Sequence, residues 1–485
     1  MDLEWHGFGI EARFSAYVEA LSDCLGHADR VAPFRSYCTG LLLPGARKSV
    51  EPMAARLCPE RTSAEHQSLL HFVGQAPWDA AALLRSVRRW VLPVMTEKRA
   101  VEAWIVDDTG FPKKGRHSVG VGHQYCGQRG KQENCQVAVS LSVATSQVSL
   151  PVAWRLYLPR SWCGDAAADA ARRARAKVPA TVAFQTKPEI ALQQITAARA
   201  EGLAPGVVLA DAGYGHSGPF RDGLAALGLD YIVGILGKTT VWPEGQAPEG
   251  ERKRGPGRPK KASEPGRGEA LPRQVSTLAK GLPAAAWRQL HWRQGSAAPL
   301  SSRFAALRVN PAPAERRRDP PRPAHWLLIE WPEGEDEPTR YWVSNLPADT
   351  AIKRLVYLAK LRWLIERDYQ ELKGELGLGH YEGRGWPGFH HHAALCIAAY
   401  GFLVAEKAAL PPSAPATAGL VKAPELPAGH RPRGSPDPNR EACLVLHCDT
   451  QTTDRLGAGA KPSEMSLLRA NHRCNKTTKE TFMTQ

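Results

Sequence analysis

The stretch VVLADAGYG, residues 207–215, joins four consecutive apolar residues to a carboxylate and then to small residues. Helical periodicity precedes this stretch at residues 190–200 and follows it at residues 220–227. A short apolar run between two helical segments is typical of a strand buried in an α/β layer. The sequence therefore predicts such a strand, with Asp211 at its end.

The segment before this strand is rich in short β-type runs. They lie at residues 104–106, 118–121, 136–143 and 148–158, and together they predict a meander. Farther along the chain, residues 231–347 again alternate between short apolar and polar runs, which indicates a β-rich insertion. The core of the protein is thus expected to be a sheet with helices on it.

The change of pattern along the chain predicts five segments. They are a helical N-terminal domain (1–96), the first part of an α/β core (97–230), a β-rich insertion (231–347), the second part of the core (348–410) and a Pro-rich tail without regular structure (411–485).

The composition indicates a large, basic globular protein. The 485 residues are 43% hydrophobic and carry a formal net charge of +15, which allows two or three domains with substantial cores. This charge favours a polyanionic partner such as nucleic acid, although a basic surface that only aids solubility has the same composition. Ten cysteines without a CxxC pair are typical of a reducing cytosol. Without a long apolar run or a leader pattern, we expect a soluble, cytoplasmic protein that does not contact a membrane.

A second acidic residue, Asp107, follows the apolar run at residues 104–106 and precedes Gly110. An acid at the end of a strand and beside a glycine turn can project into a cleft. Asp107 or Asp211 alone is more often a turn or cap residue than a metal ligand. These two aspartates therefore indicate a metal site only if a third acidic residue can join them.

The run LRWLIERDYQELK, residues 361–373, predicts a helix with a charged stripe. At 3.6 residues per turn, Arg362, Glu366 and Lys373 share one face. An apolar stripe at helical spacing would bury against a core; its members are Leu358, Leu361, Ile365, Leu372 and Leu376. A helical Glu beside an Arg is usually a surface ion pair, so Glu366 also needs partners before it indicates a site.

Together, Asp107, Asp211 and Glu366 suit phosphoryl transfer on nucleic acid. In that reaction two divalent ions about 4 Å apart bind the attacking and leaving oxygens. Carboxylate oxygens suit Mg²⁺, for which Mn²⁺ is the natural substitute, and three are enough because magnesium keeps waters and phosphate oxygens in its shell. Arg362 and Lys373 would then hold the DNA backbone beside the cleaved phosphate.

The helix resembles the tyrosine-arginine-glutamate-lysine signature of DDE transposases from bacterial insertion sequences. Arg362, Glu366 and Lys373 match three of its four positions, and Ala359 stands where the family has the tyrosine. The resemblance extends over roughly residues 1–410. It also includes the blocks at residues 107–115, 211–214, 341–346 and 377–384.

This resemblance implies a ribonuclease-H-like catalytic core of mixed-sheet α/β type, with a β-rich insertion and a helical N-terminal DNA-binding domain. It implies a bacterial, nucleoid-associated enzyme that binds the terminal repeats of its own element on double-stranded DNA, as a homodimer, and moves the element by metal-dependent cleavage and strand transfer. The family pattern of Asp, any residue, then Thr or Ser selects Asp107 rather than Asp108 as the ligand. Neighbouring residues of a strand point to opposite faces, so only one of Asp107 and Asp108 can face the metal site.

Two other functions remain open from the sequence. A non-catalytic DNA-binding protein derived from a transposase would keep the acids only as structural residues, and a nuclease with the same metal site would cleave without joining. The presence of all three acids argues against the first. Hydrolysis and strand transfer share their metal chemistry, so the sequence leaves the second open.

The run RKRGPGRPKK, residues 252–261, carries six cations and no acid. Its glycines and prolines exclude regular structure and predict an exposed loop. It resembles an AT-hook, in which an extended Arg enters the minor groove of A·T-rich DNA, and a generic basic linker is an equal alternative. In both cases we expect phosphate contacts from cations of this loop, namely Arg254, Arg258, Lys260 and Lys261.

Overall fold

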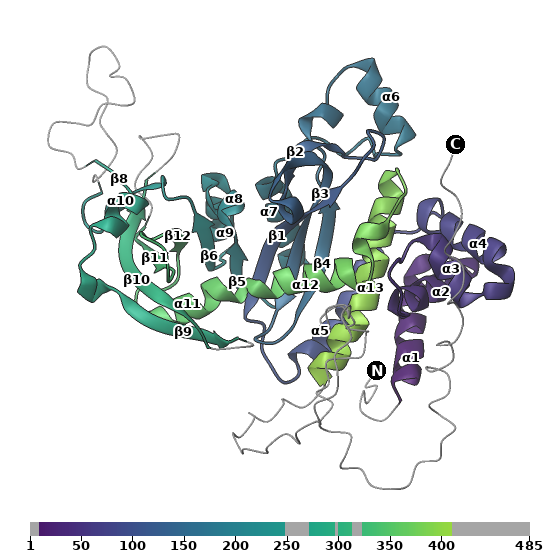
Figure 1. The fold of residues 1–485 in the computed structure, drawn as a ribbon, viewed down its shortest axis with the longest axis horizontal. Helices are drawn as coiled ribbons and strands as arrows, with labels where there is room; N and C mark the ends of the chain where they lie inside the picture. The colour runs from purple at the N-terminus through teal and green to yellow at the C-terminus, as the bar shows by residue number, and fades with distance from the viewer. Residues whose placement is uncertain (1–8, 248–270, 296–298, 313–322, 410–485) are drawn as a thin grey trace, which may run out of the picture. The chain divides into compact units, whose positions relative to one another are not determined.

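The computed structural model describes residues 9–247, 271–295, 299–312 and 323–409, which lie within one compact unit. In this part of the chain, 12 strands form one mixed sheet flanked by helices (Figure 1). The protein is therefore a mixed α/β protein, as predicted, and the sheet is consistent with a ribonuclease-H-like core.

The strands are β1 (Ala103–Pro112), β2 (Gly122–Cys126), β3 (Lys131–Ala144), β4 (Ser149–Leu156), β5 (Val207–Ala210), β6 (Tyr231–Ile235), β7 (Thr240–Pro243), β8 (Arg273–Gln274), β9 (Arg288–Gln294), β10 (Pro299–Pro311), β11 (His325–Trp331) and β12 (Arg340–Ser344). Their order in the sheet is β2-β3-β1-β5-β6-β12-β11-β10-β7-β8, with β4 paired to β3 and β9 paired to β10. The β1–β5 and β5–β6 pairs are parallel, and the other pairs are antiparallel.

The strands predicted for residues 231–347 are present, and they extend the sheet of the core. The connection is the antiparallel pair of β6 and β12, in which Ile235 lies opposite Tyr341. Backbone hydrogen bonding thus continues from the core strands to β8 without a gap. The division of this region into a separate insertion domain stays a prediction.

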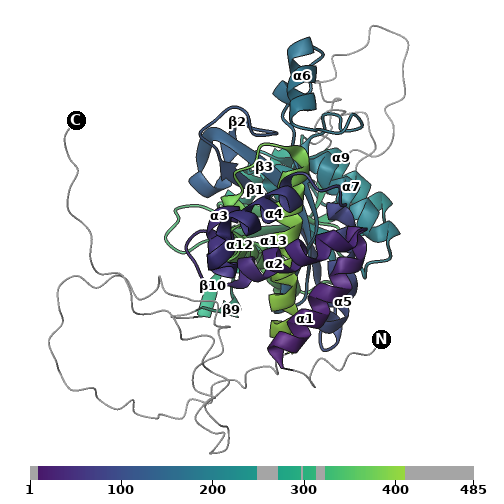
Figure 2. The ribbon, with the colours of Figure 1, turned by 90° about the vertical axis from the view of Figure 1, so that its right-hand side faces the viewer.

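The helices are α1 (Ile10–Ser22), α2 (Val31–Leu42), α3 (Val50–Leu57), α4 (Thr62–Gly74), α5 (Ala80–Thr96), α6 (Ala167–Arg175), α7 (Lys187–Ala200), α8 (Ala212–Gly215), α9 (Gly218–Ala226), α10 (Val275–Lys280), α11 (Ile352–Leu361), α12 (Trp363–Gly374) and α13 (Trp386–Ala409). Helices α11 and α12 follow one another along the sheet, where α12 packs on β1 and β4 and α11 packs on β6 and β9 (Figure 1). Helix α7 packs on β3 and on α9, and α7 and α9 are neighbours in Figure 2.

The helix predicted around residues 361–373 is interrupted at Arg362, which corrects the sequence prediction. This residue ends α11 and begins α12, and it keeps right-handed helical dihedrals. The apolar stripe is buried as expected; its members Leu358, Leu361, Ile365, Leu372 and Leu376 are at most 3% exposed. Burial on both sides of the break holds the two helices against the same sheet.

The helical character predicted for residues 1–96 is present as α1 to α5. Helices α2, α4 and α5 pack on α13, which itself packs on β4, and α5 also contacts β4 directly (Figure 1). The Tyr17 hydroxyl donates to the Ala398 carbonyl at 2.8 Å, and the Tyr37 hydroxyl lies 2.9 Å from Nδ1 of His392. The N-terminal helices therefore share one hydrophobic core with the sheet. Their standing as a separate DNA-binding domain stays a prediction.

Helix α13 is long and apolar enough to span a membrane by length and composition alone. However, 83% of its most apolar window is buried inside the protein. This helix was not predicted from the sequence, because histidines interrupt its apolar run. Its burial between the sheet and the N-terminal helices accounts for its composition.

One predicted strand is wrong. Residues 118–121 form a turn, and the strand β2 begins at Gly122. Gly120 adopts a left-handed φ of 70°, which favours a turn there. The basic loop 252–261, with the four cations singled out from its sequence, and the tail 411–485 lie outside the described residues.

Candidate active site

Asp107 and Asp211 lie at the same level of neighbouring strands. Strands β1 and β5 pair in parallel with Ile105 opposite Leu209, and each aspartate follows two residues later. Alternate residues of a strand point to the same face, so this register directs both carboxylates to one face of the sheet. Asp211 also begins α8, where its Oδ1 accepts a hydrogen bond from the Gly213 amide at 2.8 Å.

Asp107 does not end a strand, which corrects the sequence prediction. Strand β1 continues beyond it to Pro112, because β3 pairs with β1 along its whole length. Gly110 is therefore a strand residue and not a turn. A Cβ at this position would lie 2.7 Å from the Cys126 sulfur, so the glycine allows the β2–β3 hairpin to pack against β1.

Arg362 links the strand carboxylates to the helix. Its Nη1 lies 3.0 Å from Asp107 Oδ2, within ion-pair distance although not aligned as a hydrogen bond, and its Nη2 lies 3.5 Å from Glu366 Oε1. Burial lowers its pKa, but Asp107, Asp211 and Glu366 together raise that pKa above the ordinary arginine value. Two of the three acids singled out from the sequence, Asp107 and Glu366, therefore lie within ion-pair distance of one guanidinium, and the charge of Asp211 also raises its pKa.

The pKa of Asp107 is strongly shifted. Burial raises the pKa of its carboxyl to about 7. Arg362 opposes the shift, whereas the negative charges of Asp108 and Asp211 add to it. A buried acid beside other acids is stabilised in its charged form by a nearby cation, and in this structure the guanidinium has that role.

Asp108 faces the opposite side of β1. Its carboxylate lies 3.1 Å from Lys187 Nζ and accepts a hydrogen bond from the Tyr214 hydroxyl at 3.2 Å. Lys187 is the first residue of α7, which begins at a capping box formed by Thr186 and Glu189. Asp108 is thus part of a contact between β1, α7 and α8, away from Arg362.

Lys373 does not form a pair with Glu366, although both lie on the predicted stripe. Its Nζ donates to the Gly110 carbonyl at 2.7 Å and lies 4.9 Å from the centre of the Phe111 ring. Burial lowers the pKa of Lys373 to about 8. The lysine therefore fixes the end of α12 to β1 in this structure, and a DNA contact from it stays a prediction.

Tyr369, which was not predicted from the sequence, lies on the same face of α12 as Glu366 and Lys373. Its hydroxyl is 2.7 Å from the Ser140 hydroxyl, and Ser140 is the residue directly opposite Asp107 on β3. Burial raises the pKa of Tyr369 well above its ordinary value, and Asp107 raises it further. Its spacing of three residues from Glu366 is the signal that could have identified it.

Besides Asp107 of β1, Asp368 of α12 is also buried, and it is fully enclosed. The hydroxyls of Ser149 and Tyr400 donate to its two oxygens. Burial raises the pKa of Asp368 to about 7, against the lowering effect of both hydrogen bonds. This acid joins α12 to β4 and to α13.

The raised pKa of Asp368 predicts a pH dependence of stability. The folded protein binds this proton more tightly than the unfolded chain, so the free energy of unfolding should fall as pH rises from about 4 to about 7. Asp368→Asn should remove this component. Urea denaturation of both proteins between pH 4 and 8 measures it as the difference between two curves. A difference that stays constant across this range would contradict the assignment.

The donor set of the three acids fits a hard divalent ion in type, because every side chain offers only carboxylate oxygens. A positive charge already lies beside them in this structure, since Arg362 is 3.0 Å from Asp107 and lowers the pKa of its carboxyl. Among the described residues, no three His, Cys, Asp or Glu side chains are grouped closely enough to hold a metal ion. Metal binding would therefore require these side chains to move, with Arg362 leaving its present place.

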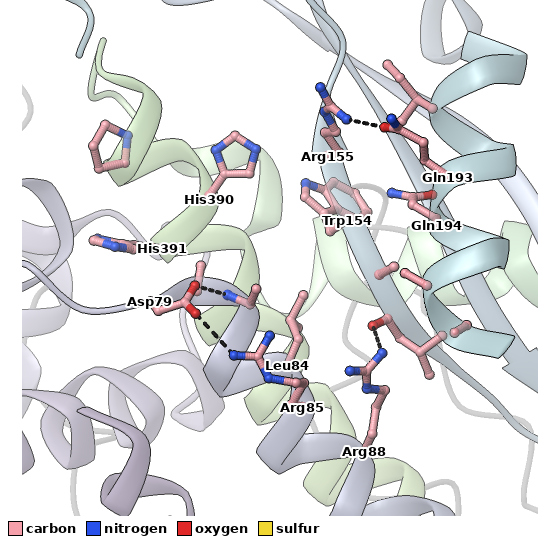
Figure 3. Close-up of a pocket in the computed structure, with 18 of the residues that line it drawn as sticks. Asp79, Leu84, Arg85, Arg88, Trp154, Arg155, Gln193, Gln194, His390 and His391 are labelled. Atoms are coloured by element: carbon pink, nitrogen blue, oxygen red, sulfur yellow. Dashed lines mark hydrogen bonds and ion pairs between the residues drawn. The ribbon is translucent and has the colours of Figure 1, made fainter. Parts of the chain in front are cut away.

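A cavity of about 530 Å³ lies elsewhere, between α5, β4, α7 and the start of α13 (Figure 3). None of the acids discussed above lines it. Two of its arginines already have polar partners, since Arg85 bonds to Asp79 at 3.2 Å and Arg155 bonds to Gln193 at 2.8 Å. The cavity is therefore not the place where the candidate site residues meet.

Comparisons with known proteins point to one family. Residues 20–299 match the family described as DDE superfamily endonuclease. The chain is also 26% identical over 322 residues to a protein of Microchaete diplosiphon named "Probable transposase for insertion sequence element IS701", and this match covers 66% of the chain and 70% of the relative. Asp107 and Asp211 lie inside the family match, whereas Glu366 lies beyond it.

Proposed function

Because the chain belongs to the DDE superfamily endonucleases, we propose that it is a DNA transposase that binds the terminal repeats of its own insertion sequence and catalyses metal-dependent strand cleavage and strand transfer. It acts in the bacterial cytoplasm on nucleoid DNA, as a homodimer that holds two DNA ends. The relative named as a transposase supports this over other endonuclease functions.

The observation that carries the proposal is the convergence on Arg362. Asp107 and Asp211 follow paired residues of adjacent parallel strands, and Arg362 lies 3.0 Å from Asp107 and 3.5 Å from Glu366 of α12. An ordinary surface ion pair would involve one acid from the same helix. Two-metal phosphoryl transfer uses carboxylates from several elements, so the nearness of these acids to one cation supports the proposal.

In the proposed mechanism Asp107, Asp211 and Glu366 are the ligands of two Mg²⁺ ions, with Mn²⁺ as a substitute. When bound, these ions supply activation of the attacking water or 3′ hydroxyl and stabilisation of the leaving oxygen. The protein's own contribution is positional: β1 and β5 fix the two aspartates.

Helix α12, which carries Glu366, is also held in position against the sheet. Tyr369 holds α12 to β3 beside Asp107 through its contact with Ser140. Arg362, released from Asp107, and Lys373 hold the DNA backbone, as do Arg254, Arg258, Lys260 and Lys261 of the basic loop.

The geometry favours Asp107 over Asp108 as the ligand, which gives a direct prediction. Asp108→Asn should cleave DNA within about tenfold of the wild-type rate, because its carboxylate contacts Lys187 and Tyr214 and not Arg362. Asp107→Asn should lose cleavage. Rates of strand nicking in Mg²⁺ measure both, and an Asp108 variant that is as inactive as the Asp107 variant would contradict the assignment.

A strand-transfer assay tests the function itself. The protein is incubated with DNA that carries the terminal repeats of its element, with a target plasmid and with Mg²⁺, and the products are separated by size. Excised and joined products are expected. Cleavage without joining would identify a nuclease, and binding without cleavage would identify a non-catalytic DNA-binding protein.

A further inference from the structure

Residues 113–132 form a connected surface feature, here called the arm. It comprises the loop after β1, the strand β2, the turn Gly127–Arg129 and the first residues of β3. In both ribbon views β2 projects at the same end of the sheet as α6 (Figures 1 and 2). Arg172 of α6 supports this loop, since its Nη2 donates to the Arg116 carbonyl at 3.3 Å.

The arm is strongly basic. Its 20 residues include five Lys or Arg and no Asp or Glu. Lys113 donates to the Tyr381 carbonyl, whereas the other four cations are exposed, namely Lys114, Arg116, Arg129 and Lys131. The nearest ionic contact is weak: Arg129 lies 3.9 Å from Glu133. Exposed cations with at most one such long contact gain free energy from a polyanion, because its binding releases counterions.

An aromatic side chain accompanies these cations. Tyr125 of β2 is 57% exposed, which is unusual for a large ring on a strand. It lies opposite Gln132, also exposed, so no apolar neighbour across the strand pair covers it. Aromatic rings among cations are typical of surfaces on which nucleic-acid bases stack.

The arm also contacts α12, the helix that carries Glu366. Gln128 at its turn accepts a hydrogen bond from Lys373 Nζ at 3.4 Å, and Lys373 is on the same helix as Glu366. Seven helical residues span about 10 Å, and one base step of DNA rises about 3.4 Å. A duplex that runs along α12 with its scissile phosphate at Glu366 would therefore reach the turn about three base steps away.

We propose that the arm binds duplex DNA beside the cleaved phosphate, with Arg129 and Lys131 on the backbone and Tyr125 against a base at the distorted DNA end. This inference rests on the proposed function for the position of the DNA. The charge and exposure of the arm support DNA as the partner independently of catalysis.

The test measures binding of the full-length protein to a labelled 30-base-pair duplex, without metal, over a range of salt concentrations. Arg129→Ala/Lys131→Ala should reduce the slope of log affinity against log salt by about 2, since each lost phosphate contact removes about 0.9. Tyr125→Ala should weaken binding to a duplex with unpaired terminal bases about tenfold and leave the slope unchanged. Thermal unfolding confirms that each variant folds.

Arg199→Ala/Lys353→Ala is the matched control, because it removes two exposed cations from α7 and α11. An unchanged slope in the arm variant, or an equal loss in the control, would overturn the inference. Mg²⁺-dependent cleavage by the wild type is scored separately. If the wild type cleaves DNA but the salt slope of the arm variant is unchanged, the proposed role of the arm is wrong and the transposase function stands. If the slope changes but the wild type does not cleave, the arm binds DNA and the proposed transposase function is wrong.

Discussion

Asp211→Asn and Glu366→Gln should each reduce Mg²⁺-dependent DNA cleavage by on the order of 10³-fold or more, because each removes one carboxylate ligand of the proposed metal pair. Neither change should unfold the protein. Asparagine is as good a helix N-cap as aspartate, so the bond to the Gly213 amide that begins α8 is retained. Glu366 is 67% exposed, and its 3.5 Å pair with Arg362 contributes little to stability.

These substitutions therefore separate catalysis from folding. Cleavage rates on terminal-repeat DNA, measured beside melting temperature and metal-free DNA affinity, give three readouts from each variant. Asp349→Asn, an exposed acid before α11, is the matched control and should keep full activity. If either site variant cleaved at the wild-type rate, the residue concerned would not be a ligand.

Breaking the ion pair of Glu330 and Lys360 should cost about 3–5 kcal/mol of folding free energy, the typical result of leaving one buried charge without its partner. Glu330 of β11 is 2% exposed, and both of its oxygens lie 2.6 Å from Lys360 Nζ. The ammonium is surrounded by aromatic rings, with Trp292 at 4.5 Å and Trp342 at 5.5 Å. Burial lowers the pKa of Lys360, and Glu330 raises it again.

Urea denaturation of three variants tests this pair. Glu330→Leu should lower the free energy of unfolding by the amount above, and Lys360→Met should lower it by less, because Arg340 stays 3.8 Å from Glu330. The double variant should recover most of the loss, since two apolar side chains leave no buried charge unpaired. Glu337→Ala breaks an exposed pair with Lys280 and should change stability by less than about 1 kcal/mol. Additive losses in the double variant would show that the two charges do not act as a pair.

Local patterns in the sequence identified most elements. The strand predicted at residues 207–210 has those bounds in the structure, because four apolar residues between a Gly and an Asp leave little choice of position. The alternation that places Asp107 and Asp108 on opposite faces also follows from strand geometry alone. Both results depend only on neighbouring residues.

Features that depend on distant partners could not be predicted in this way. Strand β1 extends past Asp107 because β3 pairs with it, and the sequence of β1 itself does not indicate that pairing. The break at Arg362 preserves the apolar spacing on both sides, so periodicity passes through it unchanged. The contact of Tyr369 with Ser140 joins residues that only the folded sheet brings together.

The pairing of β6 with β12 also sets an order on folding during synthesis. Strand β6, which contains Ile235, can pair on that edge only after Tyr341 of β12 has been synthesised. Helix α12 is synthesised later still. Such non-local pairing slows folding, because a long loop must close before the contact forms. A nascent chain that has left the ribosome only as far as β6 therefore exposes a row of free amide and carbonyl groups at that edge, open to another strand.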